Sequence, residues 1–402
     1  MDLDWSKKEE EAQRKIDAAA SDLNILSQEI WLHPELNFEE RHAHKVLTNF
    51  LEKEGFQVTR NFHLETAFKA TYGSDTGVHV CVICEYDALP EIGHACGHNL
   101  IAECGAAAGL GIKAALEMDE TPVGRVTVLG TPAEEGGGGK KDLIKAGVFQ
   151  DIDVAMMAHP FQHNISRPIV LSLVEVAIHF TGHAAHAAAS PWLGQNALDA
   201  AVMCYNSISV MRQQFKPEWR VHGIFSNGGA KPNIIPEEAE LLYYIRAPNE
   251  RELAVLKEKV LGCARGAAVS TGCEVDFKYH CSYANLVSNP TLASIYEQKA
   301  EALGVELVEP LSAGSTDMGD TSYVVPSIHP MYYIGTMEPN HSRAFTQSTG
   351  APKAQAPTLV QAKALALTAL ELLRPGNQHL MEQIRQDFRT QMEQEDPKAL
   401  VH

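Results

Sequence analysis

The sequence is short of positive charge. Its 33 lysine and arginine residues are outnumbered by 51 aspartate and glutamate residues, which gives a formal net charge of −18 at pH 7. Such an excess of negative charge repels the phosphates of nucleic acids and the head groups of anionic membranes. We therefore expect neither nucleic acid nor a membrane surface as a partner.

Long hydrophobic runs are also missing, although 45% of the residues are hydrophobic. No stretch approaches the ~20 uninterrupted apolar residues that span a bilayer. The first 15 residues are highly charged and lack the apolar core of a secretory signal. The eight cysteines are scattered without the spacing of a disulfide-rich scaffold. These features predict a cytoplasmic protein with reduced thiols.

The first 170 residues alternate between short apolar segments and longer amphipathic ones. The apolar segments predict strands at 78–85, 125–130 and 153–158, and the amphipathic ones predict helices at 6–32, 39–54, 99–116 and 142–147. Strands that alternate with helices indicate an α/β fold, with a mainly parallel sheet covered by helices on both faces.

A different pattern begins near residue 172. Its order is β-α-β-β-α-β within about 110 residues, which is typical of a ferredoxin-like α+β domain. We interpret residues 171–287 as a domain inserted into a first domain made of residues 1–170 and 288–402. The first domain is expected to resume with a helix at 291–303, a strand at 331–335 and a helix at 358–373.

Groups able to bind a metal follow the predicted strands of the first domain. In open α/β sheets, ligands bind outside the carboxyl ends of the strands, so groups that follow different strands meet at one edge. The residues concerned are Asp87, Cys96 and His98 after the first strand, Glu134 and Glu135 after the second, His159 at the end of the third, and His341 after the strand at 331–335.

Five of these side chains exceed what one tetrahedral ion with an open position requires. They are Cys96, His98, Glu135, His159 and His341. The set suits two divalent ions that share a bridging water, whose pKa such a pair lowers toward ~7. Zinc is the preferred ion, with manganese or cobalt as alternatives.

Three neighbours of this set have other expected roles. Glu134, beside a predicted ligand, is available as a general base that returns its proton to the leaving amine. Asp87 fits behind the ligands, where it would orient an imidazole. For His94 the sequence leaves two readings open, a ligand or a packing residue.

The inserted domain carries polar residues of its own. Arg246 ends a predicted strand, where a guanidinium is a natural bidentate clamp for a carboxylate, and a surface ion pair is the alternative. His186 and Asn233 would polarise a scissile carbonyl as an oxyanion hole.

Other catalytic classes fit less well. The run Gly136–Gly139 with Lys140 is not a phosphate-binding loop, because Glu134 occupies the first glycine position and Lys141 replaces the serine or threonine. No GxSxG motif supports a serine hydrolase. Cys96 as a cysteine-protease nucleophile would leave the carboxylates and the other histidines unexplained.

Seven motifs extend across nearly the whole chain, and together they resemble a known family. They are EYDALPEIGHACGHN, GTPAEEGGGG, MMAHP, GHAAHAA, KPNIIP, YYIRAP and GSTDMGDTSYVVPSIHP. The family is that of the two-metal peptidases that include carboxypeptidase G and the aminoacylases. The Cys-Gly-His motif resembles the amidohydrolase branch of auxin-conjugate and hippurate hydrolases, and EYDALP with GHACGHN is most similar to the Xaa-Arg (β-alanyl-lysine) dipeptidases.

The resemblance implies roles for individual residues. The five candidate ligands would bind the two ions, Glu134 would be the base, and Arg246 with Asn233 would grip the substrate carboxylate. The resemblance also implies a homodimer formed through the inserted domain, which acts as a lid, with His186 reaching the neighbour's active site. Glu85 stands where many relatives have a histidine, which makes Cys96 the expected substitute ligand.

The resulting hypothesis is a metal-dependent hydrolase that cleaves the amide bond of dipeptides or N-acyl amino acids. Dipeptides that end in lysine, arginine or ornithine are the first choice of substrate, and a general N-acyl-amino-acid amidohydrolase is the alternative. A catalytically silent metal-bound scaffold belongs to another class, and the intact Glu134 argues against it.

Overall fold

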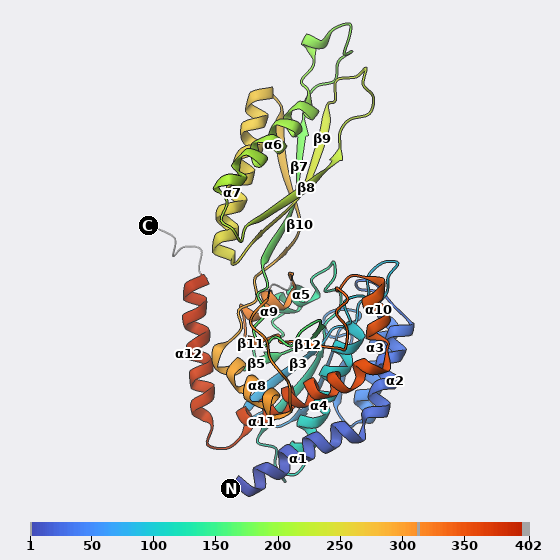
Figure 1. The fold of residues 1–402 in the computed structure, drawn as a ribbon, viewed down its shortest axis with the longest axis vertical. Coiled ribbons are helices and arrows are strands. Elements are labelled where there is room, and N and C mark those ends of the chain that lie inside the picture. Colours follow the sequence, from blue (N-terminus) through green and yellow to red (C-terminus); the bar gives the residue numbers. More distant parts are fainter. Residues whose placement is uncertain (1, 312–313, 396–402) are drawn as a thin grey trace. The chain divides into compact units, whose positions relative to one another are not determined.

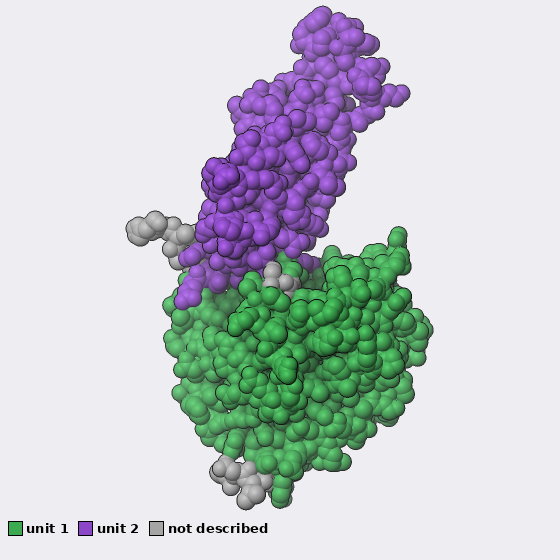
Figure 2. Space-filling view, viewed as in Figure 1, with its two compact units in different colours: residues 1–169, 286–393 green, residues 170–285, 394–402 purple. Residues whose placement is uncertain are grey.

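The computed structural model describes residues 2–311 and 314–395, and they form two compact units (Figures 1 and 2). The first unit consists of Met1–Ile169 and Leu286–Glu393, and the second is built on Val170–Asn285. The sequence prediction puts the corresponding divisions at 170/171 and 287/288. Each unit has its own hydrophobic core.

A six-stranded sheet of order β1-β2-β4-β3-β5-β11 forms the centre of the first unit. The strand pairs β4–β3, β3–β5 and β5–β11 are parallel, and β2 and β1 extend the sheet in antiparallel pairing. The central strand β3 is buried except at its first residue, as expected for a strand covered on both faces. The bounds are β1 Gln57–Arg60, β2 Phe68–Gly73, β3 Val78–Cys84, β4 Gly124–Gly130, β5 Val154–Met156 and β11 Ser327–Ile328.

Helix α4 (His98–Leu116) packs directly on this sheet, and all of its residues are buried. Two glycines allow the close approach: a Cβ on Gly105 would lie 2.6 Å from the Cys84 sulfur, and one on Gly109 would lie 2.2 Å from Val128. The N-cap is Gly97 at φ +82°, one residue before the first turn. Asn99 lies inside the first turn, where its side chain donates to Ser27 Oγ and to the Thr349 carbonyl.

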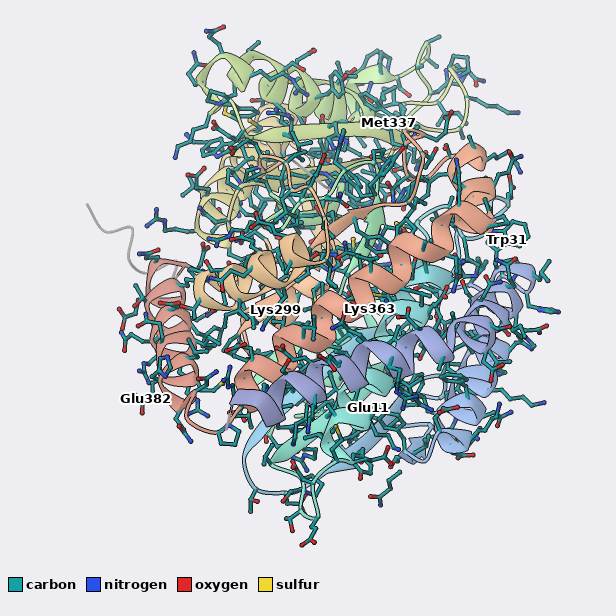
Figure 3. The ribbon with its side chains drawn as sticks, turned by 60° about the horizontal axis from the view of Figure 1, so that its bottom comes forward. Glu11, Trp31, Lys299, Met337, Lys363 and Glu382 are labelled. Atoms are coloured by element: carbon teal, nitrogen blue, oxygen red, sulfur yellow. The ribbon has the colours of Figure 1, made fainter. Side chains whose placement is uncertain are left out.

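Further helices surround the sheet, and α1 and α11 run side by side across one face of the unit (Figure 3). Two lysines labelled in Figure 3 tie them together. Lys363 Nζ lies 2.6 Å from Asp17 Oδ1, and Lys299 Nζ lies 2.8 Å from Glu9 and 2.7 Å from Glu371. The bounds are α1 Asp2–Ala18, α2 Ala20–Leu32, α3 Arg41–Lys53, α5 Gly139–Lys145, α8 Pro290–Ala302, α9 Met318–Ser322, α10 Arg343–Thr349, α11 Gln355–Leu373 and α12 Gln378–Glu395.

Among the described residues, two helical stretches are long and apolar enough on average to cross a membrane, although polar and charged residues interrupt both. They are His98–Leu116 and Pro352–Leu373, whose most apolar windows are 100% and 72% buried inside the protein. This burial is that of core helices, since their apolar surface is already covered by other elements.

The second unit is a four-stranded antiparallel sheet of order β10-β7-β9-β8. Along the chain the elements follow as β7-α6-β8-β9-α7-β10, which confirms the ferredoxin-like arrangement. Helices α6 and α7 pack against the sheet over a core that includes Val176, Leu241 and Leu256. The bounds are β7 Ser172–Thr181, α6 Ala197–Met211, β8 Arg220–Asn227, β9 Glu238–Ala247, α7 Glu250–Thr271 and β10 Glu274–Tyr283.

Two local predictions are wrong, and one strand was missed. The segment 6–32 forms two helices, α1 and α2, with a break at Ala19. The strand β12 (Met331–Tyr333) pairs with β6 (His159–Phe161) in a separate two-stranded sheet and does not join the main sheet. The edge strand β11 was not predicted, because two residues are too few to produce a recognisable pattern.

Candidate metal centre

The five predicted ligands come together in the first unit. Two groups of three ligand atoms form, and within each group all atoms lie within 4.8 Å of one another. The first group is Cys96, His98 and His159, and the second is Cys96, Glu135 and His341. Because Cys96 belongs to both groups, its sulfur lies where it can bridge two ions.

The distances between donor atoms suit a small divalent ion. Cys96 Sγ lies 3.4 Å from His159 Nε2, and Glu135 Oε1 lies 3.6 Å from His341 Nε2 and 3.9 Å from His98 Nε2. Zinc–ligand bonds of 2.0–2.3 Å in a tetrahedron put ligand atoms about 3.3–3.8 Å apart. The donor set of thiolate, imidazole and carboxylate is also one that zinc accepts.

Two ligand atoms are buried without a hydrogen-bond partner among the described residues. These are His98 Nε2, in the first group, and Glu135 Oε1, in the second, which lie 3.9 Å apart. Buried polar atoms in native proteins nearly always have a partner. Unsatisfied ligand atoms of this kind, clustered with Cys96, fit residues that hold a metal.

Asp87 orients two of the ligands from behind. Its Oδ1 lies 3.0 Å from His98 Nδ1, which turns Nε2 of that ring toward the other ligands, and its Oδ2 accepts the backbone N–H of Glu135 at 2.9 Å. Burial by itself would raise the pKa of Asp87, but the His98 ring and the hydrogen bonds outweigh it and lower the pKa. Asp87 therefore lies where the sequence predicted, behind the ligands.

Hydrogen bonds to backbone carbonyls hold the other two histidines, His159 and His341, in place. His159 Nδ1 donates to the Pro160 carbonyl at 2.8 Å, which leaves Nε2 facing Cys96. His341 has a left-handed backbone at φ +63°, and its N–H donates to the Ala95 carbonyl at 2.8 Å. A non-glycine residue in this conformation is strained, and such strain is concentrated at functional sites.

Glu134 is buried next to the ligands. One of its oxygens lies 3.9 Å from His98 Nε2, and it joins His98 and Glu135 in a third close group. Burial and the carboxylates of Glu85 and Glu135 raise its pKa well above the ordinary value. A carboxyl in this position is close enough to the ligands to exchange a proton with a group held between them.

A buried ion cluster that the sequence did not reveal lies on the other side of Glu134. Lys140 Nζ contacts Glu85 Oε1 and lies 2.7 Å from Asp317 Oδ1, and all three side chains are fully buried. Oxygens of Glu85, Glu134 and Asp317 lie within 4.8 Å of one another, so the ammonium supplies the positive charge that such a group needs. In the sequence, Lys140 was considered only as part of a phosphate-binding loop. Its position after the end of a strand is the one signal that could have indicated a role in this ion cluster.

His94 lies outside the ligand groups found in residues 2–311 and 314–395. Its Nε2 lies 3.0 Å from the Ile30 carbonyl at the end of α2, and burial lowers its pKa to about 4. Its ring therefore packs against α2, which answers the question that the sequence left open.

The three predicted substrate-binding residues belong to the second unit, which brings two of them together. The segments of His186 and Asn233 pair, since the N–H of Ala187 donates to the Asn233 carbonyl at 3.1 Å. Arg246 lies near the other end of β9, partly buried, with its guanidinium carbon 5.6 Å from the centre of the Tyr244 ring. From Glu238 at the start of β9 to Arg246, eight residue steps of about 3.4 Å each span roughly 27 Å. One copy of this unit thus cannot bring Asn233 and Arg246 to the same carboxylate, as the resemblance had implied.

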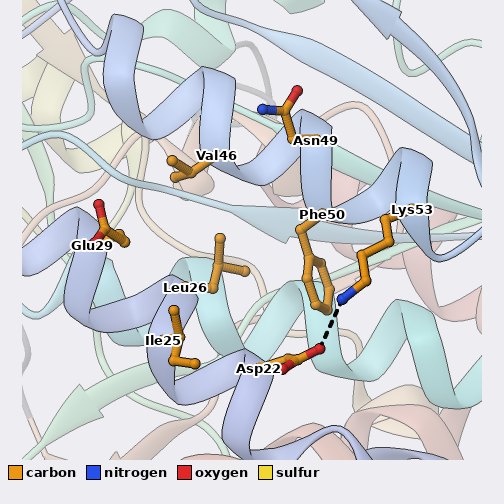
Figure 4. A pocket seen from close by; sticks show the side chains of 8 residues that line it. All are labelled: Asp22, Ile25, Leu26, Glu29, Val46, Asn49, Phe50 and Lys53. Carbon is orange, nitrogen blue, oxygen red and sulfur yellow. Dashed lines mark hydrogen bonds and ion pairs between the residues drawn. The ribbon is translucent and has the colours of Figure 1, made fainter.

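A groove between α2 and α3 is a separate feature (Figure 4). It has a volume of about 300 Å³ and is spanned by an ion pair between Lys53 Nζ and Asp22 Oδ2 at 3.0 Å. None of its lining residues is a histidine or cysteine. It therefore lacks the chemistry of the metal centre.

The fold and the site define the class of this protein: it is a metal-dependent hydrolase of amide bonds. The chain belongs to peptidase family M20/M25/M40, whose model matches residues 83–366. It is 48% identical to the Xaa-Arg dipeptidase of Mus musculus, over 96% of this chain and 93% of that protein. The Homo sapiens Xaa-Arg dipeptidase is also 48% identical, over 94% and 92% of the two chains.

More distant relatives share the fold or part of the sequence. One of the two p-aminobenzoyl-glutamate hydrolase polypeptides of Escherichia coli (strain K12) is 34% identical over 69% of this chain and 62% of that protein. A dinuclear metal-binding peptidase of the M20 family from Bacillus subtilis has the same fold, with a TM-score of 0.70, 20% identity, and coverage of 88% of this chain and 99% of that one. The predictions of an α/β fold with an inserted ferredoxin-like part and of a metal-dependent peptidase are confirmed.

Proposed function

We propose that the protein is a two-metal dipeptidase that removes a C-terminal basic residue, lysine, arginine or ornithine. The observation that carries the proposal is the pair of ligand groups joined at Cys96, with Glu134 buried beside them. The basic residue is suggested by the 48% identity to two Xaa-Arg dipeptidases. The net charge of −18 favours cationic substrates in a general way.

The residues that would hold the ions are the five ligands described above, and zinc is the ion that best suits them. When bound, such ions polarise the scissile carbonyl and lower the pKa of water. Glu134 accepts the proton of the attacking water and passes it to the leaving amine. Asp87 holds His98 and Glu135 in place throughout, through its two hydrogen bonds.

His186 has the tautomer that an oxyanion-binding role requires. Its Nδ1 accepts hydrogen bonds from the N–H groups of Ala188 at 3.2 Å and Ala189 at 3.1 Å. A neutral ring that accepts at Nδ1 carries its hydrogen on Nε2. The outer nitrogen of His186 is therefore a donor for a developing negative charge on the substrate carbonyl.

The protein acts as a homodimer in this proposal. Within one copy, about 27 Å separates Arg246 from the end of β9 near Asn233, which exceeds the length of a dipeptide. A second copy resolves this, if the partner's His186 and the partner's Asn233 contact the same substrate molecule as Arg246. The eight free cysteines, none of them fully exposed, suit a cytoplasmic enzyme.

An apolar surface on the second unit supports this dimer. On the side of α6, Phe225 of the edge strand β8 is 40% exposed beside Met203 and Val210 of the helix, which are 40% and 75% exposed. Its neighbour Ile224, which points to the opposite face of the sheet, is 61% exposed. An edge strand also offers unpaired backbone N–H and C=O groups to a second strand. A second copy that presents the same edge covers both features at once.

The interface prediction uses Ile224→Glu. A charge on the exposed face of β8 opposes pairing with a second copy, so we expect a monomer at concentrations where the unmodified protein is a dimer. Sedimentation velocity measures the change. Turnover should fall by about 100-fold or more, while the Tm of the monomer changes little. Val269→Glu, at an 85% exposed position on α7, is the matched control and should remain dimeric and active. A fully active Ile224→Glu monomer would refute the shared site.

The substrate prediction uses a panel of dipeptides and N-acyl amino acids with one common N-terminal group. We expect kcat/KM for dipeptides that end in lysine, arginine or ornithine to exceed that for neutral C-terminal residues by at least about tenfold. Arg246→Ala should raise KM for substrates with a free carboxylate by about 10- to 100-fold and spare amidated ones. An unchanged KM would argue against the clamp.

The same panel separates the alternatives. A preference for N-acyl amino acids would favour a general amidohydrolase, for which the 34% identity to the p-aminobenzoyl-glutamate hydrolase polypeptide is the supporting observation. Absence of turnover on every substrate, with metal bound, would favour the silent scaffold.

A further inference from the structure

Glu40 is a buried carboxyl that connects the start of α3 to the loop of Glu134. It is 0% exposed. Its Oε1 accepts the N–H of Ala133 at 2.9 Å, and also the N–H of Phe38 at 3.0 Å. Its Oε2 accepts the hydroxyl of Thr66 at 2.7 Å. The carboxyl thus joins three chain segments, and one of its partners immediately precedes Glu134.

Both backbone partners of this oxygen are in a conformation that non-glycine residues avoid. Phe38 and Ala133 each have φ +61°, in the left-handed region. The backbone of a non-glycine residue is strained in this region, so another interaction must hold the residue in that conformation. The shared acceptor at Glu40 Oε1 supplies such an interaction to both residues.

The segment that contains Phe38 also explains why glycines follow Glu135. A Cβ on Gly136 would lie 2.3 Å from Asn37 Nδ2, and one on Gly137 would lie 2.3 Å from the Phe38 ring. The Ala133 carbonyl accepts the N–H groups of Gly137 at 3.0 Å and Gly138 at 2.7 Å. The glycine run therefore forms a tight turn around Ala133, on which the side chains of Asn37 and Phe38 rest.

We propose that Glu40 is a positioning residue that holds Glu134 in its catalytic place, acting through the left-handed backbone of Ala133. Glu40 does not touch the ligands or the substrate in this proposal. The inference rests on the proposed function of Glu134 as the base. A displacement of about 1 Å at a catalytic group costs up to ~100-fold in rate, so an indirect residue can have a large effect.

The surroundings of Glu40 make its buried carboxyl unfavourable, which is expected only where the group has a role. Burial raises its pKa to about 7, the nearby Asp87 carboxylate adds to this, and the hydrogen bonds from Thr66 and the backbone oppose it. Tyr86, a further titratable group near it, is buried and donates its hydroxyl to the Thr66 carbonyl at 2.6 Å. A buried carboxyl is costly, and an apolar side chain of similar size would avoid that cost.

The first test compares Glu40→Leu with Glu40→Gln. Leucine removes the acceptor, and we expect kcat to fall about 10- to 100-fold with KM within about twofold and with unchanged metal content per protomer. Glutamine keeps an oxygen that accepts the Ala133 N–H, and should retain kcat within about threefold. Glu39→Gln is the matched control, since Glu39 lies next in sequence but is exposed and pairs with Arg41. A Glu40→Leu enzyme with unchanged kcat overturns the proposal.

The second test changes the backbone partner. Glycine adopts φ +61° without strain, so Ala133→Gly in the Glu40→Leu background should recover kcat about fivefold. No recovery would overturn the route through Ala133. Gly137→Ala, at an exposed position, displaces the Phe38 ring and should lower kcat at full metal content; an unchanged kcat counts against the proposal even if Glu40→Leu does not fold.

Glu134→Gln separates this inference from the proposed function. If Glu134→Gln is inactive and Glu40→Leu is fully active, the base stands and the positioning role falls. If Glu134→Gln keeps full activity, the proposed function fails, and the role of Glu40 with it.

Discussion

Replacing Glu134 with glutamine should lower kcat by about 10²–10⁴-fold while the metal content of the protein stays the same. Glutamine has nearly the same shape as glutamate but cannot accept a proton from the attacking water. Glu134 is buried beside the ligands and belongs to neither of the two groups that share Cys96, so its loss leaves all five ligands in place. Steady-state turnover, together with metal analysis of the purified variant, measures both quantities.

A control for this variant is available in the first turn of α5, the helix that follows the loop of Glu134. Lys141→Gln removes a charge a few residues further along, at a side chain that is 28% exposed and 3.7 Å from Asp320. It should keep kcat within about threefold. Full turnover by Glu134→Gln at normal metal content would remove the general-base assignment.

Replacing Cys96 with alanine should empty both ion positions together. Its sulfur is the only ligand atom common to the two groups formed by the described residues, so each position keeps only two protein ligands in the variant. Loss of a shared ligand weakens both sites, and we expect bound metal after gel filtration to fall from about two ions per protomer to less than about 0.5. Activity should fall in parallel.

His341→Ala is the informative comparison. His341 belongs to only one group and its side chain is 56% exposed, so this variant should keep about one ion per protomer. Cys263→Ala, on α7 of the second unit, is the thiol control and should keep both. Equal metal loss in the Cys96 and His341 variants would show that the sulfur is not shared.

The sequence was sufficient to predict that the candidate ligands come together because of one topological rule. Cys96, His98, Glu135 and His159 all follow strands that run in parallel, and the carboxyl ends of such strands lie at one edge of the sheet. Each ligand could therefore be located from its distance after an apolar run. The β-α-β-β-α-β order of the second unit was readable for a similar reason, since its strands and helices are long.

The supporting residues were not predictable in this way. Glu40 and Ala133 are 93 residues apart, and Lys140 and Asp317 are 177 residues apart. A single glutamate or lysine in a polar segment carries no pattern that shows burial or a distant partner. The separation between Asn233 and Arg246 was also not predicted. Asn233 precedes β9 and Arg246 lies near its far end, and neither motif shows how long the strand between them is.

The shared sulfur has a consequence for how the enzyme tolerates oxidants. A thiolate is oxidised to sulfenic and higher acids, and peroxide therefore acts on the one atom that joins the two ligand groups. A centre joined by a carboxylate would have no such weak point. Brief exposure to peroxide should release metal and inactivate the enzyme together, and a thiol reductant should restore activity only before oxidation passes the sulfenic stage.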